Sequence, residues 1–333
     1  MNVLSLFDGM SCGQQALNRL GIKYDNYYAS ELDKYAIQIT QKNFPDTIQL
    51  GDVCGVVAKD LPKDIDLLLA GSPCQGFSFA GKQLAFDDPR SALFFEFVRL
   101  LRELKPKYFL LENVRMKQEY LDVITEQVGG IEPILINSAL VSPQTRWRYY
   151  WTNIPNVTQP EDKGIVLRDV LEDYTDDVYL AGEKLQKNYK GGSQLNPKYK
   201  SQANTIHDVN KKSGTICAGT HGYANGYVAG AWRGRYKIDG VRQDGKGSVA
   251  GKTTQMLELR KDEKTNALTT VQKDNVVVEN DTMNWRKLTP LECERLQTVD
   301  DNYTEGVSNT QRYKMLGNGW TIDVISHILK HIK

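Results

Sequence analysis

The sequence predicts an α/β fold with a mostly parallel sheet, a second lobe inserted after it, and a short helical return. Three observations support this prediction. In the first half, short apolar runs alternate with stretches of helical periodicity, which is typical of consecutive βαβ units. Residues 155–285 are polar and glycine-rich and have no clear helical period. Helical patterning then resumes and continues to residue 331.

The composition is that of an ordinary globular protein, with 40% hydrophobic and 25% charged residues. A chain of 333 residues is long enough for one large and one smaller domain. No apolar run is long enough for a transmembrane helix, and the start lacks the basic segment of a secretion signal. The 5 cysteines form no CxxC pair and there are 4 histidines. We therefore expect a reduced, cytoplasmic protein without membrane contact or a metal site.

The elements expected along the chain follow from these periods. Strands are predicted at 2–6, 27–31, 65–70 and 107–111, and helices at 13–20, 33–42, 91–104 and 118–128. Residues 133–154 contain two strand-like runs separated by SPQT, which predicts an antiparallel pair at the end of the sheet. The final helices are predicted at 289–299, 308–316 and 321–331. Thr289, Pro290 and Glu292 form the pattern of a capping box with proline at the first helical position.

The stretch LSLFDGMSCGQQAL, residues 4–17, has the pattern of a strand, a glycine turn and a helix. Such an entry commonly binds a cofactor. Glu31 ends the next strand, where a ribose-binding carboxylate is expected, and Asp52 ends a third candidate strand. No Lys or Arg stands ready for phosphates, so a nucleoside fits better than a pyrophosphate. Taken alone, these residues also fit ordinary strand-end polarity.

Cys74 lies in AGSPCQGFSFAGKQ, a glycine-flanked loop that directly follows an apolar strand. This position outside the sheet edge is suited to a reactive thiolate nucleophile. The other four cysteines fit the usual role of a small buried hydrophobic residue. They are Cys12, Cys54, Cys217 and Cys293.

Two further stretches carry candidate catalytic groups. In LLENV, Glu112 and Asn113 follow an apolar strand, so Glu112 is a candidate proton donor, although a helix cap or an ion pair is an equal alternative. In QTRWRYYW, Arg146 and Arg148 have the same parity and are predicted to point to one face of a strand. Two guanidinium groups there could hold a carbonyl, a carboxylate or a phosphate, or simply face solvent.

Charge is distributed unevenly along the chain. The net charge is only +1, yet residues 182–260 contain 14 Lys or Arg against 5 Asp or Glu, a local excess of +9. A basic, glycine-rich and aromatic segment beside an acidic body indicates a domain that faces a polyanion. A solvated surface insertion would show the same pattern.

The motifs LSLFDGMSCG, GSPCQGFS, LLENV, QTRWR, RKLTPLECERLQ and MLGNGW occur in this order. Together they resemble the DNA cytosine-5 methyltransferase family over residues 1–154 and 286–333. Some of these stretches are also similar to the vertebrate de novo enzymes. The resemblance implies a Rossmann-like S-adenosylmethionine-dependent methyltransferase fold with an antiparallel edge. It also implies a catalytic domain at 1–154, a β-rich target-recognition domain at 155–285, and C-terminal helices at 286–333 that return to the catalytic domain.

The resemblance implies a mechanism as well. Cys74 would attack C6 of cytosine while Glu112 protonates N3, and C5 would take the methyl group of S-adenosyl-L-methionine, leaving S-adenosyl-L-homocysteine. A base would remove the C5 proton before Cys74 leaves. Arg148, with Arg146 beside it, would hold the cytosine O2 and phosphate, and Asn113 would order the Glu112 loop. The target base must leave the duplex stack, so the loop that carries Cys74 must close on DNA.

Two sets of binding residues are carried over from the resemblance. In the cofactor set, Phe7 would stack on adenine, Glu31 would bind the ribose and Asp52 with Val53 the adenine edge. The remaining cofactor residues are Asp8, Gly9, Met10, Leu32, Gly71, Pro73, Leu93, Asn318 and Trp320. The expected DNA-binding residues are Gln75, Ser78, Arg90, Arg233 and Arg235.

The chain departs from the family pattern in three places. Trp320 replaces the usual aliphatic residue, RLQ is not followed by proline, and Ala85 stands where a hinge glycine is common. The alternatives are a tRNA cytosine-5 methyltransferase on the same fold and a catalytically inactive DNA-binding regulator. The expected partner is double-stranded DNA, with a cognate restriction endonuclease possible and a monomer favoured. The target sequence, the phage or bacterial origin and the effect of Ala85 on loop closure stay open.

Overall fold

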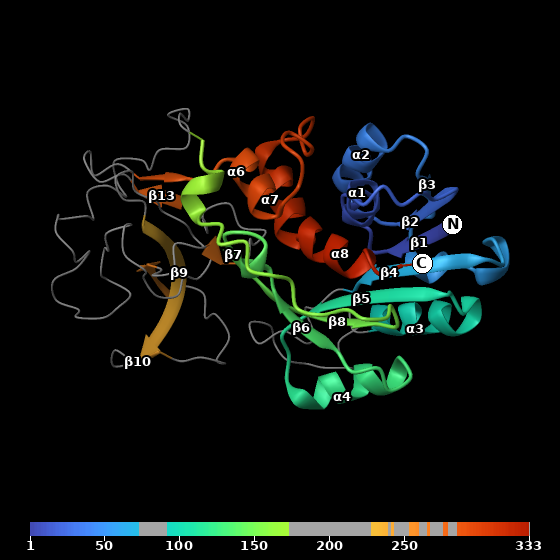
Figure 1. Cartoon of the computed structure of the whole chain (residues 1–333). Helices are drawn as coiled ribbons and strands as arrows, with labels where there is room; N and C mark the ends of the chain where they lie inside the picture. Colours follow the sequence, from blue (N-terminus) through green and yellow to red (C-terminus); the bar gives the residue numbers. More distant parts are fainter. Residues whose placement is uncertain are drawn as a thin grey trace.

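The structure is a computed structural model that describes residues 1–72, 92–172 and 288–332, and the backbone of the strands between residues 228 and 287. None of the helices it describes is long and apolar enough to span a membrane. The chain forms a large sheet with helices on both faces and a second, smaller sheet (Figure 1). The large sheet and the residues around its edge carry the candidate site.

Seven strands form the main sheet in the order β3-β2-β1-β4-β5-β8-β6. They are β1 (Asn2–Leu6), β2 (Asn26–Ser30), β3 (Ile48–Gln49), β4 (Ile65–Gly71), β5 (Tyr108–Val114), β6 (Ile134–Asn137) and β8 (Trp147–Thr152). The strands from β3 to β5 are parallel, whereas β8 runs antiparallel to both β5 and β6. This confirms the predicted parallel sheet and the predicted antiparallel pair at its end.

Side chains alternate between two cores because successive residues of a strand point to opposite faces. Val3 and Leu67 belong to the core that includes α1 and α8, whereas Leu4 and Leu68 belong to the core that includes α3 and α4. The helices that pack in these cores are α1 (Cys12–Arg19), α2 (Lys34–Asn43), α3 (Ala92–Leu104), α4 (Gln118–Gln127) and α8 (Ile322–Leu329). The strand order reverses between β2-β1 and β4-β5, and ligands of such sheets bind outside the carboxyl ends of the strands at this point.

The end of the chain returns to its beginning, as the sequence predicts. Helices α6 (Pro290–Leu296) and α7 (Asn309–Asn318) precede α8, which packs against α1. In Figure 1 the red C-terminal helices lie between the blue N-terminal part and the second sheet. The predicted capping box is present: Thr289 Oγ1 accepts from the Glu292 amide at 3.1 Å, and Glu292 accepts from the Thr289 amide at 2.8 Å.

The second sheet is formed by strands of the insert, as expected for a β-rich segment. They are β9 (Val228–Ile238), β10 (Val241–Arg242), β11 (Thr253–Leu259), β13 (Val276–Val278) and β14 (Trp285–Lys287). One further strand, β12 (Thr265–Asn266), instead pairs with β7 (Gln144–Thr145), next to the main sheet. The start of the insert also contacts the rest of the chain: Leu167 and Val170 of the 3₁₀ helix η5 (Leu167–Val170) are buried in the α1–α8 core.

Candidate active site

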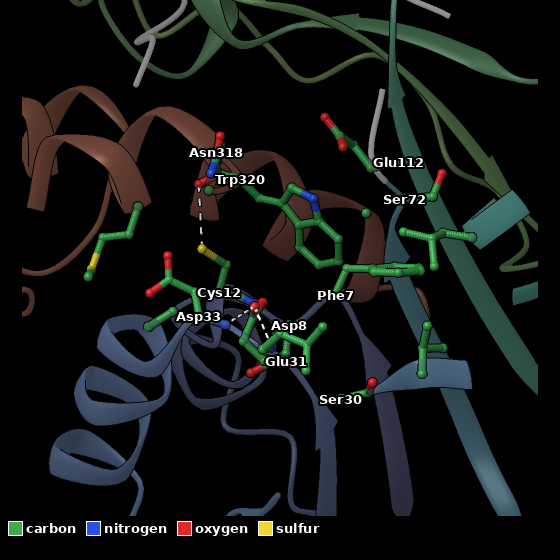
Figure 2. A pocket seen from close by; sticks show the side chains of 18 of the residues that line it. Phe7, Asp8, Cys12, Ser30, Glu31, Asp33, Ser72, Glu112, Asn318 and Trp320 are labelled. Atoms are coloured by element: carbon green, nitrogen blue, oxygen red, sulfur yellow. Dashed lines mark hydrogen bonds between the residues drawn. The ribbon is translucent and has the colours of Figure 1, made fainter. Parts of the chain in front are cut away.

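A cavity of about 410 Å³ opens at the carboxyl ends of β1, β2, β4 and β5. Its size is within the range of small-molecule sites. Phe7 and Glu31 directly follow β1 and β2, and Gly71 and Glu112 belong to the ends of β4 and β5. The segment that joins α7 to α8 closes the cavity, and Figure 2 shows the ring of Trp320 facing that of Phe7. Residues from both ends of the chain therefore build one site.

The turn between β1 and α1 has an unusual backbone. Phe7, Gly9 and Ser11 all have left-handed φ angles, of 57°, 60° and 60°. Such a conformation is strained for Phe and Ser, at a cost of order 1–3 kcal/mol each. Side-chain bonds from Asp8 stabilise the turn, because its carboxyl group accepts from Ser11 Oγ at 2.6 Å and from the Tyr27 hydroxyl at 2.8 Å. The turn is thereby fixed with the ring of Phe7 on the cavity.

The carboxylate of Glu31 is held by three backbone amides. It accepts from Gly9 at 2.7 Å through Oε2, and from Leu32 at 2.7 Å and Asp33 at 2.8 Å through Oε1. A carboxylate offers about four acceptor positions, so one position is left for a ligand hydroxyl. A rigidly held carboxylate with one open acceptor position can bind a hydroxyl group of a ligand.

Asp8 is almost completely buried below this turn. Burial raises its pKa to about 6, and the nearby Glu31 carboxylate raises it further, while the hydrogen bonds from Ser11 and Tyr27 act in the opposite direction. Asp8 thus titrates close to neutral pH. The buried thiol of Cys12, also on the cavity, is inert in comparison, because burial raises its pKa to about 12.

Asp52 and Val53, which the sequence analysis predicts at the adenine edge, lie at a short helical turn. Asp52 caps the 3₁₀ helix η1 (Val53–Gly55), and its Oδ1 accepts from the Cys54 amide at 3.0 Å. Arg99 of α3 donates to the carbonyl of Val56 at 2.9 Å and so ties this turn to α3. Asp52 and Val53 both line the cavity, as predicted.

Two glycines permit close packing at the opposite wall. A Cβ atom at Gly71 would lie 2.8 Å from Nε1 of Trp320, and one at Gly319 would lie 2.9 Å from Cε of Met10. Both positions therefore require glycine. The indole of Trp320 occupies the space beside Gly71.

The catalytic candidates meet at the same cavity. Glu112 and Arg148 form an ion pair of 2.8 Å between Oε1 and Nε, and both are largely buried, with side chains 10% and 15% exposed. Asn113 donates from Nδ2 to Ser72 Oγ at 3.0 Å. Glu112 and Asn113 lie within β5 and do not follow it, because the strand continues to pair with β8 as far as Val114. The strand was predicted to end at residue 111 and ends at Val114. Glu112 and Asn113 still line the cavity.

Arg146 differs from Arg148 in its partners. It lies between β7 and β8, not within a strand, so the predicted alternation along one strand does not apply. Its side chain is buried and its guanidinium group donates to the carbonyls of Gly317 at 3.3 Å and Gly319 at 2.9 Å. Arg146 lines the cavity, but it holds the cavity wall, whereas Arg148 contacts the candidate acid.

Nearly all of the predicted cofactor residues that the structure describes line the cavity. They are Phe7, Asp8, Gly9, Glu31, Leu32, Asp52, Val53, Gly71, Leu93, Asn318 and Trp320. Met10 is the exception, since its side chain is fully buried in the core. Pro73, Cys74, Gln75, Ser78 and Arg90 lie outside the described residues, and so do the side chains of Arg233 and Arg235.

The sequence analysis missed several residues that line the cavity. They include Cys12, Ser30, Asp33, Ser72, Gly317 and Gly319. A signal existed for some of them, because Ser72 precedes the candidate nucleophile loop and the two glycines flank Asn318. Cys12 belongs to the motif LSLFDGMSCG but was predicted to be a small buried hydrophobic residue, and the structure shows it both buried and on the cavity.

A family model described as C-5 cytosine-specific DNA methylase matches residues 1–333. The chain belongs to this family. It is 29% identical to the orphan methyltransferase M.SPRI of Bacillus phage SPR, over 100% of this chain and 97% of that protein. It is also 29% identical to the type II methyltransferase M1.ScrFI of Lactococcus lactis subsp. cremoris, over 92% of this chain and 71% of that protein.

The fold agrees with this membership. The solved structure of the Entamoeba histolytica methyltransferase EhMeth matches with a TM-score of 0.68, covering 99% of this chain and 97% of the other at 17% identity. At that identity the likeness concerns the fold alone, and it confirms the S-adenosylmethionine-dependent methyltransferase fold that the motifs predict. As a member of the family, the chain is a DNA cytosine-5 methyltransferase, which confirms the predicted class of enzyme.

Asp8 should make the stability of this methyltransferase depend on pH. Its pKa is about 6 in the folded protein against an ordinary value of 3.8. The folded state therefore binds the Asp8 proton more tightly than the unfolded state does. The stability that this proton contributes is full below the unfolded pKa of 3.8 and is lost as the pH rises through about 6. Asp8→Asn does not titrate. The free energy of unfolding of the variant, relative to the native protein, should rise by about 2 kcal/mol between about pH 4 and pH 7, measured by urea unfolding.

Asp33→Asn is the control for this measurement. Burial opposes the charge of Asp33, but the hydrogen bonds from Lys314 and the Tyr35 amide outweigh it and lower its pKa. Its titration lies below the window, so this variant should show little change relative to the native protein between about pH 4 and pH 7. A flat difference for Asp8→Asn would contradict the raised pKa.

Proposed function

We propose that this site transfers the methyl group of S-adenosyl-L-methionine to C5 of a cytosine turned out of duplex DNA. One observation carries the proposal: a single cavity has the rigid Glu31 carboxylate and the Phe7 ring together with the Glu112–Arg148 ion pair. A nucleoside cofactor and a flipped base would therefore bind next to each other in the same cavity. Bisulfite sequencing of DNA from cells that express the protein tests the proposal and gives the target sequence.

The residues of the cavity fit the cofactor. Phe7, Val53 and Leu93 supply apolar surface for a purine, and Glu31 has an acceptor position left for the ribose hydroxyls. The backbone at Gly9 is open, because a Cβ atom there would meet nothing within 4 Å. When bound, the cofactor supplies an electrophilic methyl group. Asp8, Glu31 and Asp33 make this part of the cavity acidic, which favours a ligand with positive charge.

The protein residues would then carry out the remaining steps. The Cys74 thiolate forms a bond to C6, which makes C5 nucleophilic. Glu112 hydrogen-bonds and protonates N3, and Arg148, which holds the Glu112 carboxylate in the free protein, reaches the cytosine O2. Asn113 binds Ser72, the residue before Pro73 and Cys74, and so orders the base of the nucleophile loop. Loss of the C5 proton to a base and departure of Cys74 complete the reaction.

Recognition of the DNA sequence belongs to the insert in this proposal. Arg233 and Arg235 lie in β9, opposite Met256 and Thr254 of β11. The local excess of positive charge in residues 182–260 supports phosphate contacts. Gln75, Ser78 and Arg90 would contact DNA from the nucleophile loop. The similarity to a type II methyltransferase supports a search for a cognate restriction endonuclease. The scattered cysteines support a cytoplasmic location. The oligomeric state is to be measured.

Cys74→Ala should abolish methyl transfer while leaving cofactor binding nearly unchanged, because the thiol bonds to substrate only during the reaction. A duplex with 5-fluorocytosine at the target position should trap the native enzyme as an adduct that survives denaturation, since fluorine cannot leave as a cation. Cys54 is exposed, so its predicted burial was wrong. Cys54→Ala removes this thiol and should keep activity. The absence of any adduct at a known target site would reject the nucleophile.

Glu112→Gln should lower the rate constant of methyl transfer about 10²–10⁴-fold, the usual effect of removing a general acid. The amide keeps the shape and a hydrogen-bond donor but has no proton to transfer. The dissociation constant of the cofactor, measured by equilibrium dialysis, should barely change. If the variant were as fast as the native enzyme at neutral pH, Glu112 would not be the proton donor.

Arg233→Ala and Arg235→Ala should reveal which arginine of β9 touches bases. An arginine that reads a base edge should cost about 1–3 kcal/mol at one base pair only, whereas a phosphate contact should weaken binding to all duplexes alike. Methylation of a library with randomised target sites separates these results. If exchange of the whole insert with that of a relative left the methylated sequence unchanged, the assignment of recognition to residues 155–285 would fail.

A further inference from the structure

Gln297 lies directly after α6 and is completely buried, yet it does not line the cavity. Its side chain uses both of its polar atoms. Nε2 donates to the carbonyl of Leu316 at 2.7 Å and to that of Gly319 at 3.2 Å. Oε1 accepts from Thr321 Oγ1 at 2.8 Å and from Gln144 Nε2 at 3.1 Å. The amide is therefore fully bonded, two bonds given and two received.

The groups that Gln297 contacts belong to the wall of the cavity. Leu316 and Gly319 flank Gly317 and Asn318, and Asn318, Gly319 and Trp320 line the cavity. Arg146 donates to the carbonyls of Gly317 and Gly319 from the other side. The backbone carbonyls of this short segment are thus fixed by two buried side chains from distant parts of the chain.

The connection also extends in the opposite direction. Gln144 lies in β7, and its backbone pairs with Thr265 of β12, a strand of the insert. Thr321 in turn contacts Ser138 Oγ at 2.9 Å. The side chain of Gln297, at the end of α6, consequently connects β7 with the cavity wall.

We propose that Gln297 is a positioning residue for the cofactor: its amide, bonded to Leu316, Gly319, Thr321 and Gln144, fixes the wall around Asn318 and Trp320 and so sets cofactor affinity. This rests on the proposed function, because it concerns the same cavity. An amide is required, because a carboxylate cannot donate to the two carbonyls. An apolar side chain can neither donate to them nor accept from Thr321 and Gln144. Loss of the amide removes the Gln297 donor from the buried Leu316 carbonyl, whereas the Gly319 carbonyl keeps its bond from Arg146. A lost bond is costly in a dry environment.

The test compares Gln297→Met with Gln15→Met. Gln15 is also buried, but its amide atoms have no hydrogen-bond partner among the described residues and it does not line the cavity. The dissociation constant of S-adenosyl-L-methionine is measured by equilibrium dialysis without DNA. It should rise about tenfold or more for Gln297→Met, as one lost buried bond implies, and should stay within about twofold for Gln15→Met. The kcat per folded enzyme at saturating cofactor should be retained.

A second variant covers the case in which Gln297→Met does not fold. Thr321→Val removes the bond to Gln297 Oε1 together with the contact to Ser138 Oγ, with little change in shape. It should weaken cofactor binding about threefold. A purely structural role would lower the unfolding temperature or the kcat without changing the dissociation constant, and that result overturns the inference while the proposed function stands. If the native protein itself failed to bind S-adenosyl-L-methionine, the cofactor assignment would fall, and this inference with it.

Discussion

The cavity depends on the packing of the last part of the chain against the first. Helix α8 lies on α1, and hydrogen bonds join the first and last parts of the chain. The Tyr303 hydroxyl donates to the carbonyl of Met10 at 2.7 Å, and Cys12 Sγ contacts the carbonyl of Trp320 at 3.9 Å. Without this packing the carboxyl ends of the strands would form an open edge. The strained turn from Phe7 to Ser11 would also lose the bond from Tyr303 to the Met10 carbonyl.

Three carboxyl groups line one part of this cavity, and each of them has different hydrogen-bond partners. Glu31 is held as a carboxylate by three amides, and Asp33 is bonded to Lys314. Asp8 has only neutral donors, so burial raises its pKa. In a region of low dielectric constant, like charges this close would otherwise destabilise the fold. Asp8 therefore takes up a proton at about pH 6, which lowers the buried charge as the pH falls below neutral.

The fold was largely accessible from the sequence because its elements are strongly periodic. The strand at residues 2–6 agrees with β1, and the capping residues from Thr289 mark the start of α6. The errors concern strand ends. Glu112 lies inside β5, since pairing with β8 extends the strand beyond its apolar residues. Met10 was grouped with the cofactor residues by its place in the motif, and the structure shows its side chain buried in the core close to Gly319.

The sequence by itself determined which chemical groups stand at the strand ends, because parallel strands bring their carboxyl ends to one edge and each motif directly follows or ends a strand. Phe7, Glu31 and Glu112 meet at the cavity for this reason. Only the tertiary structure decided how two arginines of the same motif are used. Arg146 binds the carbonyls of Gly317 and Gly319, whereas Arg148 pairs with Glu112. Those carbonyls come from a segment that is about half the chain away in sequence, and no local pattern around residue 146 contains it.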